Sequence, residues 1–318
     1  MVVHLGFWLI VAAGAALQAY AWPYTVDDAY ILLRYADHLS RGAGLVWNVG
    51  ESPPVEGFTC FLWVVALAPL TWLPVEPIVT AKAATMGASA LLLWLLWRWV
   101  RLLTPGSSSR PAPASLIPVA LVGLYPGQPL YGASGLETVP FAVLVLAGLL
   151  AFCRESAAEG PRRPGWSAVL LAAAALTRPE GVLLAAPCVA SLMWRVRTGR
   201  SRMARAVAWL AVYGCILAAF LLIRRVYFHE WLPNTYFAKV GGASVIARLC
   251  YGRRYLVSAL GSWAGWYEPP EIPSSSMGSA AAAVAACVFG AACVWAVRRP
   301  AGRLLLATAV LLIAAMVY

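Results

Sequence analysis

The sequence predicts an all-α integral membrane protein that crosses the bilayer several times. Of its 318 residues, 62% are hydrophobic and 12% are charged, about half of the roughly 25% charged residues typical of globular proteins. A soluble core of this size cannot hide so much apolar side chain. Uncharged runs such as residues 7–26 approach the ~20 residues needed to span a hydrocarbon core. The lipid bilayer is therefore the expected solvent of this chain.

The positions of the predicted spans follow from the lengths of the apolar runs. The nine runs are residues 5–23, 78–98, 115–126, 138–153, 166–177, 182–195, 205–223, 277–297 and 302–318. The shorter runs are expected to be extended by flanking residues or to lie beside broken helices. The first run has no basic segment ahead of it and is interpreted as a retained span. Residues 1–318 are thus treated as one transmembrane domain.

A further apolar stretch, residues 58–74, is either another span or a helix lying along the membrane surface. In the second case the predicted cytoplasmic loops hold 14 of the 24 Lys and Arg residues, and only Glu155 and Glu159 of the 13 acidic ones. In the first case the dense basic loop 194–205 would lie outside, against the positive-inside rule. The charges therefore favour a surface helix.

This orientation leaves four predicted extracytoplasmic loops, at residues 24–77, 127–137, 178–181 and 224–276. They hold most of the acidic residues. Either these carboxylates line a polar cavity at the outer surface, or acidic residues are simply excluded from the short cytoplasmic turns. The net charge of +11 is concentrated beside the spans, which excludes a nucleic-acid partner.

Cysteine and histidine give no support for a metal or disulfide framework. The seven cysteines are scattered without a CxxC pair and are interpreted as small buried hydrophobes. His4, His38 and His229 are far apart, and neither HxH nor HExxH occurs. No metal site and no cofactor are therefore expected from the residues.

Two adjacent aspartates, Asp27 and Asp28, open the first long loop. Apolar residues at helical spacing predict a helix from about Asp27 to the turn at Gly42 and Gly44. Thr25 stands three residues before Asp28, which fits a capping box. One aspartate therefore either caps this helix or belongs to a site. Two carboxylates exceed what capping needs, which favours a functional site at the mouth of a span.

Four segments in order resemble GT-C glycosyltransferases, specifically the branch with the actinobacterial arabinofuranosyltransferases that use decaprenyl-phosphoryl arabinose. The segments are DDAYILLRYADHLSRGAGLVWNVGE with PPVEGFTCFLW, then YGASGLETVPFA at 131–142, ALTRPEG at 175–181 and LPNTYFAK at 232–239. The resemblance implies a GT-C-like helix bundle in the plasma membrane. It also implies inverting transfer of a sugar, with arabinofuranose as one candidate, from a polyprenyl-phosphate donor to a cell-envelope glycan or other acceptor outside the membrane.

The resemblance assigns roles to particular residues. Such a transfer needs one carboxylate base and cations that stabilise the leaving phosphate. It implies Asp27 or Asp28 as the base and Glu137 as a second acidic group. Arg178, Lys239, Arg253 and Arg254 are candidates for the donor phosphate, although an arginine beside a span also snorkels to headgroups. Further substrate-binding candidates are Arg34, Tyr35, Trp47, Asn48, Glu56, Glu180 and Asn234.

Some members of the family use a divalent cation, but no ligand pattern here supports one. Glu180 follows Pro179 and serves either the site or the start of the next helix, and Trp47 is either a sugar contact or an interfacial anchor. The sequence ends within its ninth predicted span, so the C-terminal part of the family is expected to be absent. The alternatives are an inactive scaffold or assembly paralogue, and a secondary transporter. No inverted repeat supports the transporter.

Overall fold

The computed structural model describes residues 2–103, 113–125, 127–157, 165–199, 201 and 203–240, and single residues or short stretches beyond them at 244, 246, 250–254, 257–258, 303–304, 306–307 and 309. This part of the chain contains helices and no strand. Four helices are long and apolar enough to cross a membrane: α1 (Val2–Tyr20), α4 (Pro77–Leu103), α7 (Thr138–Ala157) and α10 (Met203–Phe228). The prediction of an all-α membrane protein is confirmed.

Shorter helices occupy the other predicted spans of this region. They are η2 (Pro113–Leu116), α5 (Ile117–Gly123), α8 (Trp166–Thr177), η3 (Pro179–Leu184) and α9 (Ala185–Arg197), whereas α6 (Gln128–Gly132) lies in the predicted outer loop 127–137. Pro118, Pro129 and Pro179 stand in first turns, where a missing N–H costs nothing. The shorter apolar runs thus form broken or flanked helices, as expected. The predicted span 277–297 and most of 302–318 lie outside the described residues.

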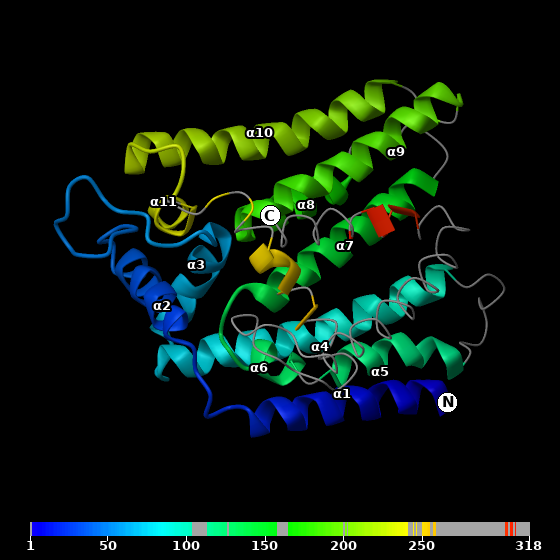
Figure 1. The fold of residues 1–318 in the computed structure, drawn as a ribbon, viewed down its shortest axis with the longest axis horizontal. Helices are drawn as coiled ribbons and strands as arrows, with labels where there is room; N and C mark the ends of the chain where they lie inside the picture. Colours follow the sequence, from blue (N-terminus) through cyan, green and yellow to red (C-terminus); the bar gives the residue numbers. More distant parts are fainter. Residues whose placement is uncertain are drawn as a thin grey trace.

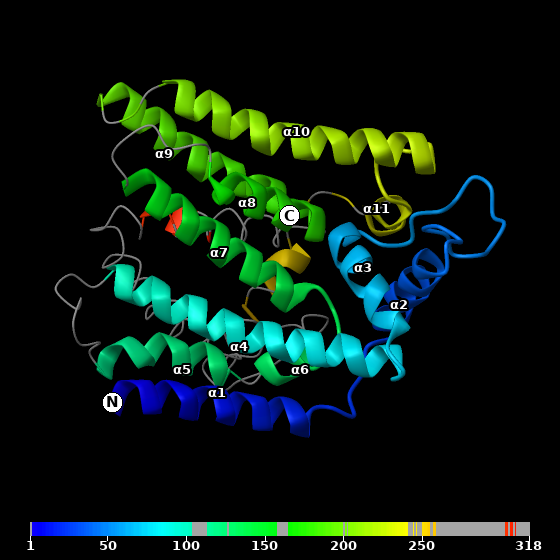
Figure 2. The ribbon, with the colours of Figure 1, turned by 180° about the vertical axis from the view of Figure 1, so that it is seen from behind.

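The long helices lie side by side, and three short helices gather at one end of them (Figures 1 and 2). Contacts run in the order α1, α4, α7, α8 and α10 across the bundle. At one end lie α2 (Asp27–Ser40), α3 (Phe61–Leu67) and α11 (Asn234–Val240). Segments predicted to lie outside the membrane therefore collect at one end of the bundle.

The apolar stretch at 58–74 folds as α3 followed by η1 (Ala68–Trp72). Together they make a helical segment from Phe61 to Trp72, which at about 1.5–2.0 Å per residue is well short of the ~30 Å hydrocarbon core. The segment packs against α2 and α4. Its length and packing agree with the non-spanning alternative.

The helix that begins at Asp27 has the predicted bounds but not the predicted cap. It ends at Ser40 and is followed by Gly42 and Gly44 with φ of 79° and 89°, in the left-handed region that favours glycine. Its N-cap residue is Val26, and no side chain caps it. The capping-box prediction is wrong, because the Thr25 hydroxyl instead accepts a hydrogen bond from Lys82.

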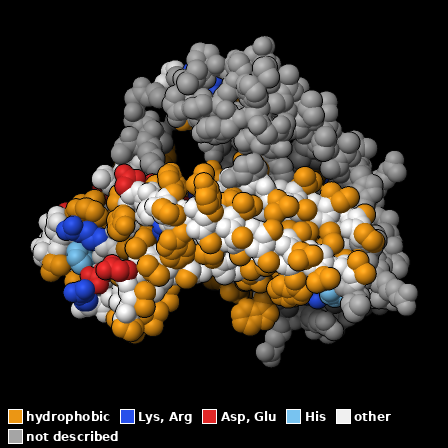
Figure 3. All heavy atoms as spheres, turned by 90° about the horizontal axis from the view of Figure 1, so that it is seen from below, with side chains coloured by type: hydrophobic (Ala, Val, Ile, Leu, Met, Phe, Trp, Pro, Cys, Tyr) orange, Lys and Arg blue, Asp and Glu red, His pale blue; other side chains and the backbone are white. Residues whose placement is uncertain are grey.

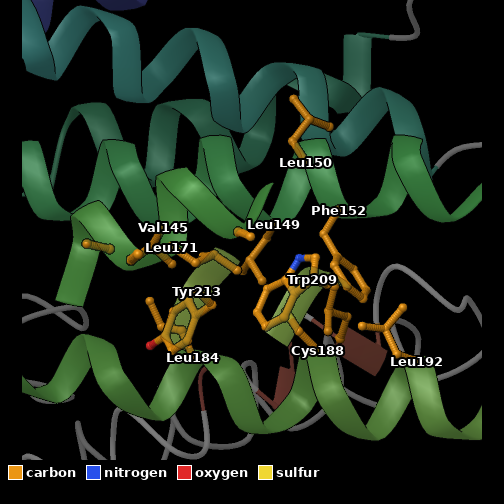
Figure 4. Close-up of a cluster of buried hydrophobic side chains, with 14 of the residues drawn as sticks. Val145, Leu149, Leu150, Phe152, Leu171, Leu184, Cys188, Leu192, Trp209 and Tyr213 are labelled. Atoms are coloured by element: carbon orange, nitrogen blue, oxygen red, sulfur yellow. The ribbon is translucent and has the colours of Figure 1, made fainter. Parts of the chain in front are cut away.

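The largest core cluster lies between α4, α7, α8, α9 and α10, where Leu149, Leu171 and Trp209 are buried (Figure 4). A Cβ on Gly148 would lie 2.7 Å from a Leu171 methyl carbon, so glycine permits this close approach of α7 and α8, as is common between membrane helices. A second cluster joins α2, α3 and the end of α10. The bundle and its α2–α3 end are thus held together by separate apolar cores.

The surface of the bundle is apolar, whereas the surface of its α2–α3 end is charged. Hydrophobic side chains cover most of the described face that carries α1, and charged side chains gather at the end that carries α2 (Figure 3). Val2, Leu5, Trp8 and Leu9 of α1 are all exposed. An apolar belt of this extent is typical of a surface in contact with lipid.

Candidate functional site

Four loops that are far apart in the sequence are joined by direct hydrogen bonds at the α2–α3 end of the bundle. The Trp63 indole donates to the Gly135 carbonyl at 2.9 Å, and the Asn234 amide donates to the Glu56 carbonyl at 3.1 Å. Arg178 donates to Glu137 at 2.9 Å. These bonds link the predicted outer loops 24–77, 127–137, 178–181 and 224–276 into one surface.

The carboxylates of Asp27 and Asp28 lie exposed in the first turn of α2. Asp27 Oδ1 accepts a hydrogen bond from the Asp28 amide at 3.0 Å. Within the described residues neither carboxylate forms an ion pair, and Asp28 accepts no hydrogen bond through its side chain. Both face solvent at a helix N-terminus, where the helix dipole favours negative charge. Asp28 is the less engaged of the two.

Lys82 of α4 fixes the chain immediately ahead of these aspartates. Its Nζ atom donates to the carbonyls of Trp22 and Tyr24 at 2.6 and 2.8 Å and to Thr25 Oγ1 at 2.7 Å. Sequence analysis passed over this residue. The signal that would have found it is a single lysine inside an apolar span, which is costly without partners and therefore marks a site.

Glu137, Arg178 and Glu180 form a compact charged cluster. The Arg178 guanidinium lies 2.9 Å from Glu137 Oε1 through Nη1 and 2.6 Å from Glu180 Oε1 through Nε. Burial alone would lower the pKa of Arg178, but Glu180 and Glu137 outweigh it and raise that pKa. One guanidinium is thus shared by two carboxylates, which leaves the cluster with a net negative charge.

The buried Cys60 thiol adjoins this cluster from the start of α3. Burial and the neighbouring Glu137 carboxylate raise the pKa of Cys60 well above its usual value. The thiol therefore remains protonated at neutral pH and acts as a neutral neighbour of Glu137.

Four of the predicted substrate-binding residues come together around α2. Arg34 donates to the Trp47 carbonyl at 2.8 Å and to Asn48 Oδ1 at 3.2 Å, and its guanidinium lies 4.3 Å from the Trp47 ring centroid. The Tyr35 hydroxyl donates to the Val55 carbonyl at 2.8 Å. Burial raises the pKa of Tyr35. These contacts fold the segment after α2 back onto that helix.

Glu56 is buried against α10. Its Oε2 lies 2.9 Å from Arg224 Nε, and its Oε1 accepts from Arg224 Nη2 at 3.0 Å. Burial raises the pKa of Glu56, against the opposing influence of Arg224. Only 3% of the Glu56 residue is exposed, so its carboxylate does not face the solvent beside Asp28. Its ion pair instead joins the first loop to α10. Sequence analysis did not identify Arg224 as its partner.

The remaining predicted phosphate ligands lie later in the chain. Lys239 is part of α11, and Arg253 and Arg254 are exposed in a short helical stretch. Among the described residues, no group of three or more His, Cys, Asp and Glu is placed to hold a metal ion.

The fold and this surface define a class: a membrane helix bundle whose loops build a carboxylate-rich site at one end. The chain is similar to the terminal beta-(1->2)-arabinofuranosyltransferase of Mycobacterium tuberculosis, with 29% identity over 253 residues. The similarity covers 74% of this chain and 39% of that protein, so the chain spans about two fifths of the relative's length. It supports a related glycosyltransferase. No family model and no solved structure matches the chain.

Proposed function

We propose that this protein is a GT-C-like membrane glycosyltransferase of the plasma membrane with an extracytoplasmic site. It transfers a sugar from a polyprenyl-phosphate donor to a cell-envelope glycan or another acceptor. The observation that carries the proposal is the exposed Asp27–Asp28 pair, at the same end of the bundle as the Glu137–Arg178–Glu180 cluster. The similarity to an arabinofuranosyltransferase supports the same reaction class.

In this proposal Asp28 is the general base. Its carboxylate takes the proton of an acceptor hydroxyl as that oxygen attacks the anomeric carbon of the donor sugar. The bond from that carbon to the phosphate oxygen breaks, and the polyprenyl phosphate leaves with the bonding electron pair. A single displacement of this kind inverts the anomeric centre, and a positioned base of this kind typically contributes ~10²–10⁴-fold.

The cationic and second acidic roles fall to different loops. Lys239, Arg253 and Arg254 are proposed to neutralise the leaving phosphate, because charge-assisted hydrogen bonds to phosphate are strong. Arg178 is already engaged by Glu137 and Glu180, so we assign it to holding these carboxylates toward the acceptor hydroxyls. Arg34 and Trp47 lie against each other beside α2, and we propose that a sugar ring stacks on them.

The proposal is tested with the purified protein in nanodiscs and radiolabelled polyprenyl-phosphate sugars. Pentose and hexose donors are compared, and transfer to a glycan acceptor is measured beside donor binding. We expect donor binding and acceptor labelling in the wild type and loss of labelling in Asp28→Asn. Donor binding without any transfer would instead indicate an inactive scaffold, and sugar uptake into proteoliposomes would indicate a transporter.

A further inference from the structure

Lys82 is a buried charge that the proposed chemistry does not use. It is the single charged residue between Pro77 and Trp97 of α4, and only 3% of its surface is exposed. An ionisable side chain within a membrane-spanning helix is costly unless its polar atoms find partners. The hydrogen-bond partners of Lys82 therefore indicate its structural role.

All three N–H donors of the Lys82 ammonium are used, and this group has no acceptor. The acceptors are the Trp22 and Tyr24 carbonyls and the Thr25 hydroxyl, at 2.6–2.8 Å. These three residues lie in the connection between α1 and α2, and Thr25 stands two residues before Asp27. The acceptors are uncharged, and no ion pair of Lys82 with a carboxylate occurs among the described residues. The hydrogen bonds of the ammonium therefore hold the backbone and hydroxyl of this connection and do not neutralise a carboxylate.

The same turn of α4 also holds the loop that carries Glu137. A Cβ on Gly135 would lie 3.3 Å from Ala81 Cβ and 3.7 Å from the Lys82 amide nitrogen, and Gly135 has a φ of 77° that favours glycine. The loop therefore packs directly on α4 at Ala81 and Lys82. One helical turn thus contacts both acidic parts of the candidate site.

We infer that Lys82 is a positioning residue that fixes the Asp27–Asp28 pair relative to the Glu137 loop through its three hydrogen bonds to the α1–α2 connection. This inference rests on the proposed transfer reaction for the role of the aspartates, whereas the tether itself does not. A methionine at this position would fill a similar space but leave the three oxygen atoms without their donor. The connection would then move freely on α4, and the base would lose its place.

The test compares Lys82→Met, Lys82→Arg and Thr25→Val with wild type in nanodiscs. Thr25→Val removes one of the three acceptors and keeps the lysine. Thr85→Val is the matched control, because Thr85 is buried one turn further along α4 and its hydroxyl bonds only the Lys82 carbonyl of its own helix. Amide hydrogen exchange of residues 21–30, kcat and the donor KM are measured, with exchange in α7 and α8 as the monitor of the whole fold.

We expect Lys82→Met to lower kcat by about 100-fold, the effect of misplacing a reacting group by about 1 Å. The donor KM should change less than about threefold, since only chemistry depends on the base. Exchange at residues 21–30 should rise while α7 and α8 stay protected. Thr25→Val should show the same changes in milder form, Lys82→Arg should restore part of kcat, and Thr85→Val should match the wild type.

Three results would overturn the inference: unchanged exchange at residues 21–30 in Lys82→Met, a raised KM at unchanged kcat, or loss of protection throughout α7 and α8. The last would make Lys82 a determinant of the whole fold. If the wild type transfers no sugar, the proposed function fails, and the exchange data, which need no substrate, still decide whether the tether exists.

Discussion

Arg224 Nε lies 2.9 Å from Glu56 Oε2, which pairs the end of α10 with a residue 168 positions earlier in the chain. Both residues are buried. The Glu56 carbonyl also accepts from the Asn234 amide just beyond α10. The ion pair therefore closes the first loop onto the last long helix of the described part.

Replacing Arg224 with Met should destabilise the protein by about 3–5 kcal/mol, because Glu56 then lies buried without its counter-ion. The double variant Glu56→Gln/Arg224→Met should recover part of this loss, since neither charge remains. The two proteins are compared by thermal unfolding in nanodiscs. Equal stability of the single variant and the wild type would show that the pair contributes nothing.

The Arg224→Met variant should also lose stability as the pH rises. Burial raises the pKa of Glu56 and Arg224 lowers it, so removing the arginine raises that pKa further. Above the usual Glu pKa of about 4.3, the folded variant then keeps a proton that the unfolded chain has released. Stability must fall with pH in this window. A flat profile from acid to neutral pH would contradict the assignment of Glu56 as the buried group.

The helices of the bundle could be predicted from local sequence patterns. Apolar run length predicted the helices of α1, α4, α7 and α10, because lipid exposure makes long uncharged runs necessary. The spacing of the residues after Asp27 predicted α2 within its observed bounds. These signals are local and repeat along one element, so they can be recognised without knowledge of the fold.

The partners in the site depend on contacts between distant segments, and no local pattern contains them. The capping box predicted at Thr25 does not form, because Lys82 reaches the hydroxyl from another helix. Arg224 stands one residue beyond a predicted span, where an arginine is ordinarily interpreted as a headgroup contact. Sequence analysis predicted Asp28 and Glu137 on the same side of the membrane. It did not predict that the two loops carrying them both contact α4, at Lys82 and at Ala81.

Arg178 should be needed for the charge balance of its cluster. Replacing it with Gln leaves Glu137 and Glu180 without their shared partner, and hydrogen bonds to charged groups are worth about 1.5–3 kcal/mol each when buried. Because Arg178 is about one-third exposed (31%), we expect a loss near the lower end of this range, together with slower transfer. Thermal unfolding and transfer rates are measured, and Arg178→Gln/Glu180→Gln should be more stable than Arg178→Gln alone. No difference between these two variants would count against a shared guanidinium.

The sidedness of the bundle is tested by cysteine labelling in intact cells. Cys215 and Cys250 are exposed, so both are first replaced in a functional background. A cysteine at Ser52 in the first loop should react with an impermeant thiol reagent, and one at Ser201 between α9 and α10 should not, because the basic residues around Ser201 favour the cytoplasmic side. Labelling at Ser201 with protection at Ser52 would invert the proposed orientation.

The division of labour between Asp27 and Asp28 is the sharpest test of the proposed mechanism. Successive side chains on a helix project about 100° apart, so the two carboxylates cannot address one hydroxyl equally. Asp27 accepts the Asp28 amide, whereas the Asp28 side chain has no hydrogen-bond partner among the described residues, which leaves it free to take a proton.

Asp28→Asn should therefore lower sugar transfer by ~10²–10⁴-fold, the usual contribution of a positioned base, with donor binding and thermal midpoint near those of the wild type. Asp27→Asn keeps an amide oxygen that accepts the same backbone hydrogen bond, so its effect on transfer should be much smaller. The measurements are transfer rate, donor affinity and thermal unfolding on the purified variants. A larger loss in Asp27→Asn would exchange the two roles. If the wild type is active and both variants keep near-normal transfer, an aspartate base at this helix is excluded.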